Sequence, residues 1–191
     1  MNKEKFDFIK EKYGLLASWA VWAEVGDSPK SNMGDLSIFD DPSIIDSLNE
    51  NIVFVGLNIS RGSIKIPLAN FHDPSPRATD FKTRFALKST PYWGGYMTDI
   101  IKNYDEIDSG KIPSYLKDNP KVETENIKAF EEELADLESQ DPLIAAFGGL
   151  AFKILKRNFE DKYRILPLPH YANYESKEKY RTKVINVLNE N

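Results

Sequence analysis

The stretch Asn51-Ile52-Val53-Phe54-Val55-Gly56-Leu57-Asn58-Ile59-Ser60 decides the fold class. Its apolar part, residues 52–55, is short, β-branched and aromatic, which is typical of a strand buried on both faces of a sheet. The run then reaches a glycine and, two residues later, an asparagine. Because open parallel sheets place their ligands just beyond the carboxyl ends of their strands, Asn58 is a candidate functional residue.

A second strand end of this kind lies far downstream, in Arg164-Ile165-Leu166-Pro167-Leu168-Pro169-His170-Tyr171-Ala172-Asn173. Helix-like and strand-like patterns alternate along the chain, which favours a parallel sheet of about four strands with helices on both faces. Right-handed crossovers gather the carboxyl ends of such strands at one edge. We therefore predict an α/β fold in which four residues meet at that edge: Asn58, Asp99, Gly148 and His170.

The sequence predicts one domain over residues 1–191, with N-terminal helices in 1–49 and an α/β core in 50–191. Thr79 and Ser176 are predicted helix caps, and Asp99 is predicted to follow the end of a strand. The expected strands are 52–57, 96–98, 143–147 and 163–168, and the expected helices are 3–13, 42–48, 79–88, 124–140, 150–159 and 176–188, with a further amphipathic segment at 15–22.

Composition excludes several classes of site. The chain has no cysteine, which removes disulfides, thiolate metal sites, iron–sulfur clusters and a cysteine nucleophile. Two histidines, His72 and His170, argue against a multi-histidine metal site, and we expect no metal and no cofactor. No apolar run reaches the ~20 residues of a membrane span, and no signal-peptide pattern opens the chain. We expect a cytoplasmic protein that does not contact membranes.

The net charge of −5 argues against tight, non-specific binding to a polyanion. Acidic residues concentrate in 123–138, whereas basic residues recur around the first strand end. Such segregation permits a basic working face on an acidic protein. The basic residues concerned are Arg61, Lys65, Arg77, Lys82, Arg84 and Lys88.

Four segments occur in an order that resembles the uracil-DNA glycosylase superfamily, over roughly residues 50–185. They read GLNIS at 56–60, YMTD at 96–99, AFGGLA at 146–151 and LPHYAN at 168–173. The resemblance implies a four-stranded parallel sheet in a three-layer α/β/α sandwich. It also implies a DNA-repair hydrolase that excises a damaged or deaminated, uracil-type base. The implied partner is DNA, single-stranded or mismatched, with a flipped base, and we expect a monomer.

The resemblance also implies roles for individual residues. Asn58 matches the position that holds the catalytic water, and His170 matches the histidine that hydrogen-bonds the base oxygen as charge develops on it. Phe71 is similar to the aromatic residue that stacks on the extruded base. Asp99 falls where several members have an asparagine that reads the base edge. The predicted substrate-binding residues are Gly56, Leu57, Phe71, Asp99 and Asn173, and Gly148 and Gly149 fit positions of close backbone approach.

The sequence departs from the family pattern in three places. Ile59 stands where the family usually has proline, and Tyr171-Ala172 stands where Pro-Ser usually follows the histidine. The third is Asp99, because a carboxylate only accepts hydrogen bonds when ionised. It favours a base that presents amino or imino donors, unless the carboxyl keeps its proton.

Cleavage of a glycosidic bond calls for residues of these types. Glycosidic cleavage builds positive charge on the sugar, so the departing base needs a donor, which His170 supplies. Asn58 is a poor base and would act by orienting water, so slow turnover is expected.

Other interpretations of these residues stay open. In them, Asn58 is a turn residue, Asp99 caps a helix, and both His170 and His72 are loop residues. The alternative functions are a non-catalytic nucleic-acid or nucleotide-binding module and a small-molecule α/β enzyme.

Overall fold

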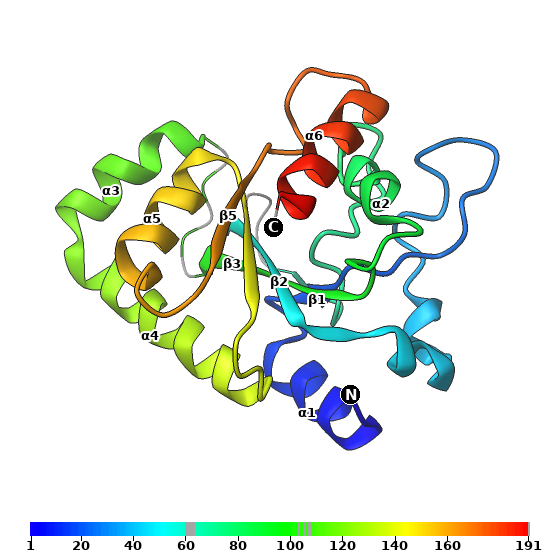
Figure 1. Ribbon diagram of the computed structural model, residues 1–191, viewed down its shortest axis with the longest axis horizontal. Coiled ribbons are helices and arrows are strands. Elements are labelled where there is room, and N and C mark those ends of the chain that lie inside the picture. The colour runs from blue at the N-terminus through cyan, green and yellow to red at the C-terminus, as the bar shows by residue number, and fades with distance from the viewer. Residues whose placement is uncertain (60–63, 103, 105, 107, 191) are drawn as a thin grey trace.

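The computed structural model describes residues 1–59, 64–102, 104, 106 and 108–190. Its centre is a five-stranded sheet (Figure 1). The strands are β1 (Ser18–Trp19), β2 (Asn49–Asn58), β3 (Gly95–Ile101), β4 (Leu143–Phe147) and β5 (Ile165–Leu168). Their spatial order is β1-β3-β2-β4-β5. Strands β2 to β5 pair in parallel, as predicted, and β1 pairs antiparallel with β3.

Helices cover both faces of this sheet (Figure 1). Helices α2 and α6 pack together over one face, and α1, α4 and α5 contribute to the core on the other. The α-helices are α1 (Lys3–Tyr13), α2 (Phe81–Leu87), α3 (Ile112–Asp118), α4 (Pro120–Asp136), α5 (Gly149–Phe159) and α6 (Lys177–Asn189), and short 3-10 helices span Ser37–Asp40, Pro42–Ser47 and Ser109–Lys111.

Side chains of strand β2 pack into the hydrophobic cores on both faces of the sheet. Val53 and Val55 pack on the face of α4 and α5, whereas Phe54 packs on the face of α2 and α6. Both sets of side chains are fully buried, which explains the unbroken apolar run in the sequence. By the same alternation, Gly56 and Asn58 belong to the α2–α6 face, and Leu57 belongs to the other.

The structure corrects two predictions, one for the segment 15–22 and one for the position of Asp99. Residues 15–22 hold strand β1 instead of a separate amphipathic segment, and residues 17–22 are all buried, so no amphipathic period applies there. Strand β3 runs on to Ile101, so Asp99 lies inside the strand and not beyond it. The apolar pair Ile100 and Ile101 continues the pairing, and the carboxylate is buried within the sheet.

Helices α2 and α4 also differ from their predicted bounds, and one cap is confirmed. Helix α2 begins at Phe81 and Asp80 occupies its N-cap position, so Thr79 is not the cap. Helix α4 begins earlier than predicted because Pro120 stands at its first turn. The Ser176 hydroxyl accepts a hydrogen bond from the Lys179 N–H at 3.3 Å, which confirms the predicted cap of α6.

Within the described part of the chain, no helix has the length and apolar character that crossing a bilayer requires. The predicted cytoplasmic location stays a prediction.

We expect Gly94→Ala to destabilise the fold by about 2–4 kcal/mol in urea unfolding. Gly94 has a φ of 85°, and an added Cβ would press on the Ser47 carbonyl. Its N–H also donates to the carbonyl oxygen of Ala20 at 3.0 Å. The matched control is Gly149→Ala, whose Cβ would meet no described atom within 4 Å. The control should change stability by about 1 kcal/mol or less; equal losses in both variants would contradict the prediction.

Candidate active site

The strand register brings the two predicted catalytic residues to one edge of the sheet. Val55 pairs with Ala146, and Ala146 pairs with Pro167. Asn58 ends β2 and His170 lies just beyond the end of β5, so both stand at the carboxyl-end edge of the parallel strands, with β4 between β2 and β5. Neighbouring strands lie ~4.8 Å apart, so β2 and β5 run roughly 10 Å apart across β4.

Asn58 is the last residue of β2, so the turn interpretation does not apply to it. Its Nδ2 donates to the carbonyl oxygens of Glu106 at 2.8 Å and Tyr104 at 3.1 Å, in the segment that follows β3. These bonds fix which way the amide faces. Among the described residues, none donates to the Asn58 Oδ1, which is therefore an oriented acceptor.

His170 lies just beyond β5 and rests against the end of β4. Its Cδ2 lies 3.4 Å from the position that a Cβ on Gly148 would take. The Ala172 N–H donates to its Nδ1 at 3.1 Å, so the ring proton belongs on Nε2. Burial lowers the pKa of His170, which favours the neutral ring. No described residue accepts a hydrogen bond from Nε2. If His170 were only a hydrogen-bonded loop residue, its role would explain the Nδ1 contact but not the position of Nε2.

Gly56, Asp99 and Phe71 are packed together. Gly56 pairs with Asp99 in the register, and the Asp99 Oδ1 occupies the space that a Cβ on Gly56 would fill. Asn70 donates from Nδ2 to the other carboxylate oxygen at 3.0 Å. Burial raises the pKa of Asp99 to about 6, and the Asn70 hydrogen bond opposes this rise. Because Asp99 lies within β3, the helix-cap interpretation is wrong.

Phe71 occupies an uncommon backbone conformation beside this carboxylate, with a φ of 64°. A bulky residue with positive φ costs on the order of 1–3 kcal/mol, and such strain clusters at functional sites. Two hydrogen bonds hold it: its N–H donates to the Asn70 Oδ1 at 3.1 Å, and its carbonyl accepts from the Trp22 indole at 3.2 Å. Its ring is buried and lies 3.3 Å from the Cβ position of Gly56.

An aromatic chain joins the two halves of the site. The Phe147 ring lies 6.5 Å from that of Phe71 and 5.4 Å from that of Tyr171, and Tyr171 stacks on His170 at 4.4 Å. The site therefore has a continuous apolar wall between its carboxylate and its imidazole. Tyr92 lies elsewhere and donates its hydroxyl hydrogen to the Leu188 carbonyl at the end of α6.

Two predicted substrate-binding residues are placed differently. The Leu57 side chain packs in the core on the opposite face, so only its main chain could serve the site. Asn173 is exposed in the loop after His170, where it lines a hollow of about 450 Å³. That hollow also includes Tyr174, which is fully exposed at 108% and which the sequence analysis missed. An aromatic residue among polar loop residues was the available signal.

The predicted basic face is wrong in part. Lys82 is buried and donates to the Asn173 carbonyl at 2.8 Å. Arg84 is also buried and donates to the carbonyls of Ala23 and Pro29. These charges hold loops in place instead of forming an open surface, and Arg61 lies outside the described residues.

His72 is structural. It is buried, which lowers its pKa, and its ring nitrogens lie 2.8 Å from the Val21 carbonyl oxygen and 2.9 Å from that of Asn70. In the described part of the chain, no three His, Asp or Glu side chains gather as a metal site would require.

In comparisons with protein-family models, curated proteins and solved structures, nothing matches this chain. The family resemblance therefore stays a prediction.

We expect Asp99→Asn to gain stability over wild type as the pH rises from 4 to 7. Because the folded-state pKa of about 6 exceeds the ordinary 3.8, wild type loses stability as the pH rises through this window. The loss amounts to about 3 kcal/mol in the free energy of unfolding, and Asn cannot incur it. Urea unfolding at several pH values measures the difference.

Asp35→Asn is the control for this comparison. The hydrogen bonds from Ser37 lower the pKa of the exposed Asp35, so the sign reverses: this variant should lose stability relative to wild type as the pH rises to about 4, and the difference should stay nearly constant above about pH 5. A flat difference for Asp99→Asn would mean that Asp99 ionises as freely in the folded protein as in the unfolded chain.

Proposed function

We propose that this protein is a hydrolase of the uracil-DNA glycosylase type, which cleaves the N-glycosidic bond of an altered base in DNA. One observation carries the proposal. Asn58 ends β2 and His170 follows β5 at the same edge of the parallel strands, and among the described residues the Asn58 Oδ1 and the His170 Nε2 have no hydrogen-bond partner. This pairing supplies an acceptor for water and a donor for a departing base.

The reaction breaks the bond between the sugar C1′ and the base nitrogen, and water forms the new bond to C1′. His170 donates from Nε2–H to the base oxygen while negative charge gathers there. Asn58 accepts a hydrogen bond from the attacking water through Oδ1 and so orients it. The water proton passes to solvent and the base anion takes a proton from solvent. Burial lowers the pKa of His170, so its neutral ring acts as a hydrogen-bond donor and keeps its Nε2 proton.

Asp99 and the aromatic wall supply recognition. Above pH 6 the carboxylate accepts a hydrogen bond from an N–H group on the base edge. Tyr171 is partly exposed and offers an aromatic face to a base taken out of the stack, and the buried ring of Phe147 packs against it. Uracil, hypoxanthine and xanthine all carry such an N–H group beside a carbonyl.

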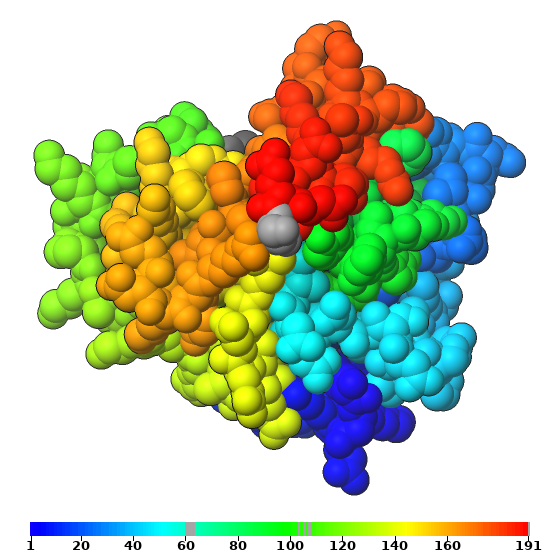
Figure 2. Space-filling model, viewed as in Figure 1, coloured from blue at the N-terminus to red at the C-terminus, as the bar shows by residue number. Residues whose placement is uncertain are grey.

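The loop after His170 offers a contact to the nucleic acid. It stands out from the surface in orange at the top of Figure 2. Tyr174 is fully exposed there. An exposed aromatic ring in the loop that follows His170 suits stacking on a neighbouring base or insertion into the gap that a flipped base leaves.

Excision assays test the enzyme claim. We expect an abasic product from uracil-, hypoxanthine- or xanthine-containing oligonucleotides, single- or double-stranded. Asn58→Ala and His170→Ala should each lower the rate by about 100-fold or more, since each removes a preorganised contact to developing charge or to water. Asn51→Ala, an exposed asparagine at the other end of the same strand, should leave the rate unchanged. No excision of any of these bases by folded protein would remove the claim for them.

The alternative is a non-catalytic nucleic-acid or nucleotide-binding module on the same fold. The amide at position 58 favours it, because an amide has no basic character with which to activate water. Salt-sensitive binding without an abasic product would support this alternative.

Tyr174→Ala should weaken binding to a single-stranded oligonucleotide by about tenfold, because stacking on one base contributes ~1–3 kcal/mol. The control is Phe8→Ala, a partly exposed aromatic residue on α1, at the far end of the molecule in Figure 1. Fluorescence anisotropy measures both affinities. Equal affinities for wild type and the Tyr174 variant would place nucleic acid away from this loop.

A further inference from the structure

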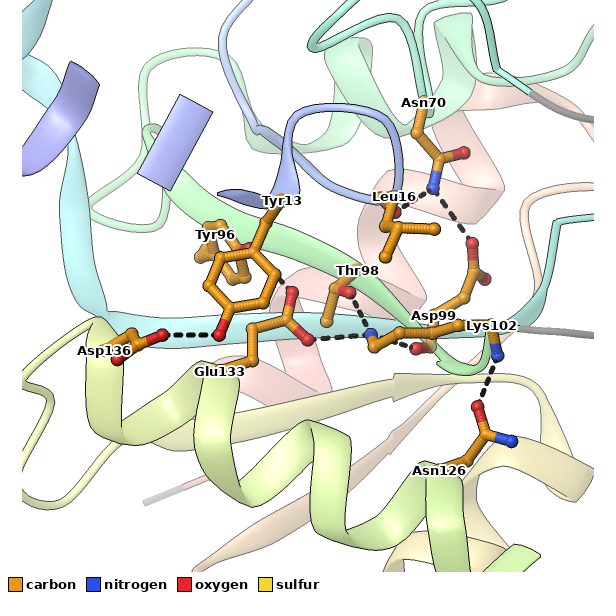
Figure 3. A network of polar contacts seen from close by, with 10 residues as sticks. All are labelled: Tyr13, Leu16, Asn70, Tyr96, Thr98, Asp99, Lys102, Asn126, Glu133 and Asp136. Carbon is orange, nitrogen blue, oxygen red and sulfur yellow. Dashed lines mark hydrogen bonds and ion pairs between the residues drawn. The ribbon is translucent and has the colours of Figure 1, made fainter. Parts of the chain in front are cut away.

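A buried ion pair lies directly behind Asp99 (Figure 3). Lys102 Nζ lies 2.7 Å from a carboxylate oxygen of Glu133, and their side chains are 4% and 0% exposed. The same ammonium donates to the Thr98 hydroxyl at 2.7 Å and to the Asp99 carbonyl at 2.6 Å. Two ammonium hydrogens are therefore donated to oxygens of β3, one of them on the main chain of Asp99, while Glu133 holds the ammonium as an ion pair.

The surroundings of the pair lock it in place. The other Glu133 oxygen accepts from the Tyr96 hydroxyl at 2.6 Å, and burial raises the pKa of Tyr96 well above its usual range, so the tyrosine stays a donor. The Lys102 N–H donates to the Asn126 side chain of α4 at 2.7 Å. The end of β3 is thus tied to α4 through both the main chain and the side chain of Lys102.

Stability alone explains this pair poorly. Removing two charges from water costs several kcal/mol per ion, and well-packed apolar replacements are often neutral or stabilising. The position of the pair suggests another role. In Figure 3 the ammonium points toward α4, whereas the Asp99 carboxylate leaves β3 toward Asn70. The pair is hidden from the proposed site but adjoins the residue that faces it.

The charges around Asp99 are few. Lys102 favours its ionised form, Glu133 and Asp80 oppose it, and Asn70 offers a neutral donor. On the β2 side it meets Gly56, which carries no charge. Of the charged groups that act on Asp99 within the described chain, Lys102 is the cation.

We propose that Lys102, held by Glu133, is a positioning residue that keeps Asp99 fixed in place as an anionic hydrogen-bond acceptor. An ionised Asp99 accepts from a base N–H, whereas a protonated Asp99 would donate to a base carbonyl. Lys102 therefore decides which base edge the site selects. This inference rests on the proposed function for its substrate, but not for the charge state of Asp99.

Two substitutions of opposite sign test the inference. Lys102→Met removes the cation, so the pH at which Asp99 titrates should rise by about 1 unit or more. Glu133→Gln removes the opposing anion and keeps a partner for Tyr96 and Lys102, so this midpoint should fall. Carboxyl ¹³C NMR of aspartate-labelled protein reports the midpoint, with Asp99→Asn to identify the signal.

A merely structural pair would not move the midpoint in opposite directions. Unchanged midpoints, or midpoints that move the same way in both variants, overturn the inference. Should Lys102→Met fail to fold, Glu133→Gln decides alone: a fall supports the inference, and no fall overturns it. The titration needs no substrate, so its result is separate from the success or failure of the excision assay.

Excision provides the second readout. Wild type should prefer uracil over 3-methyluracil, which lacks the N–H group, by at least about tenfold at pH 7. Lys102→Met should reduce this preference at pH 7 and recover it at higher pH, where Asp99 ionises. A preference that stays constant with pH in Lys102→Met would refute the selective role even if the midpoints shift.

Discussion

The close approach of Asp99 to Gly56 is the contact on which the rest of the site depends. The carboxylate fills the space where any other residue would carry a Cβ, so it lies on the face of the sheet, directly against the main chain of β2. A carboxylate in that place needs a partner, and Asn70 provides one. Asn70 in turn also holds Phe71 in its strained conformation. Glycine, carboxylate, amide and aromatic ring therefore form one unit, in which each member fixes the next.

The two buried carboxylates Glu133 and Asp99 have different partners. Glu133 has a cation and a tyrosine hydroxyl beside it, whereas Asp99 has a neutral amide on one oxygen. Keeping Asp99 ionised at neutral pH costs about 3 kcal/mol, a large share of the ~5–15 kcal/mol by which domains are stable. A buried acid with so costly a charge is typical of functional sites. The asymmetry supports placing the ligand on the Asp99 side of β3.

Much of the fold was predictable because its signals are local. The apolar run of β2 and the hydroxyl cap at Ser176 are set by neighbouring residues. Strand β1 was not predictable, since two residues carry no period. The opposite placement of Leu57 followed from strand alternation once Asn58 was assigned to the site. Lys82 and Arg84 show that a cluster of basic residues in the sequence does not predict an exposed basic surface. Both side chains are buried and donate hydrogen bonds to carbonyl oxygens from distant parts of the chain.

The two halves of the site differ in what creates them. Asn58 and His170 lie at the same edge because parallel strands with right-handed crossovers end there, and that follows from the order of strands in the sequence. The Asp99 half depends on Gly56, Asn70 and the ion pair on α4, which come from separate parts of the chain and have no common local pattern. In the proposed glycosylase the reactive pair is thus the part that topology supplies. Selectivity comes from tertiary packing, so two chains with the same strand order and the same reactive pair can differ in the base they accept.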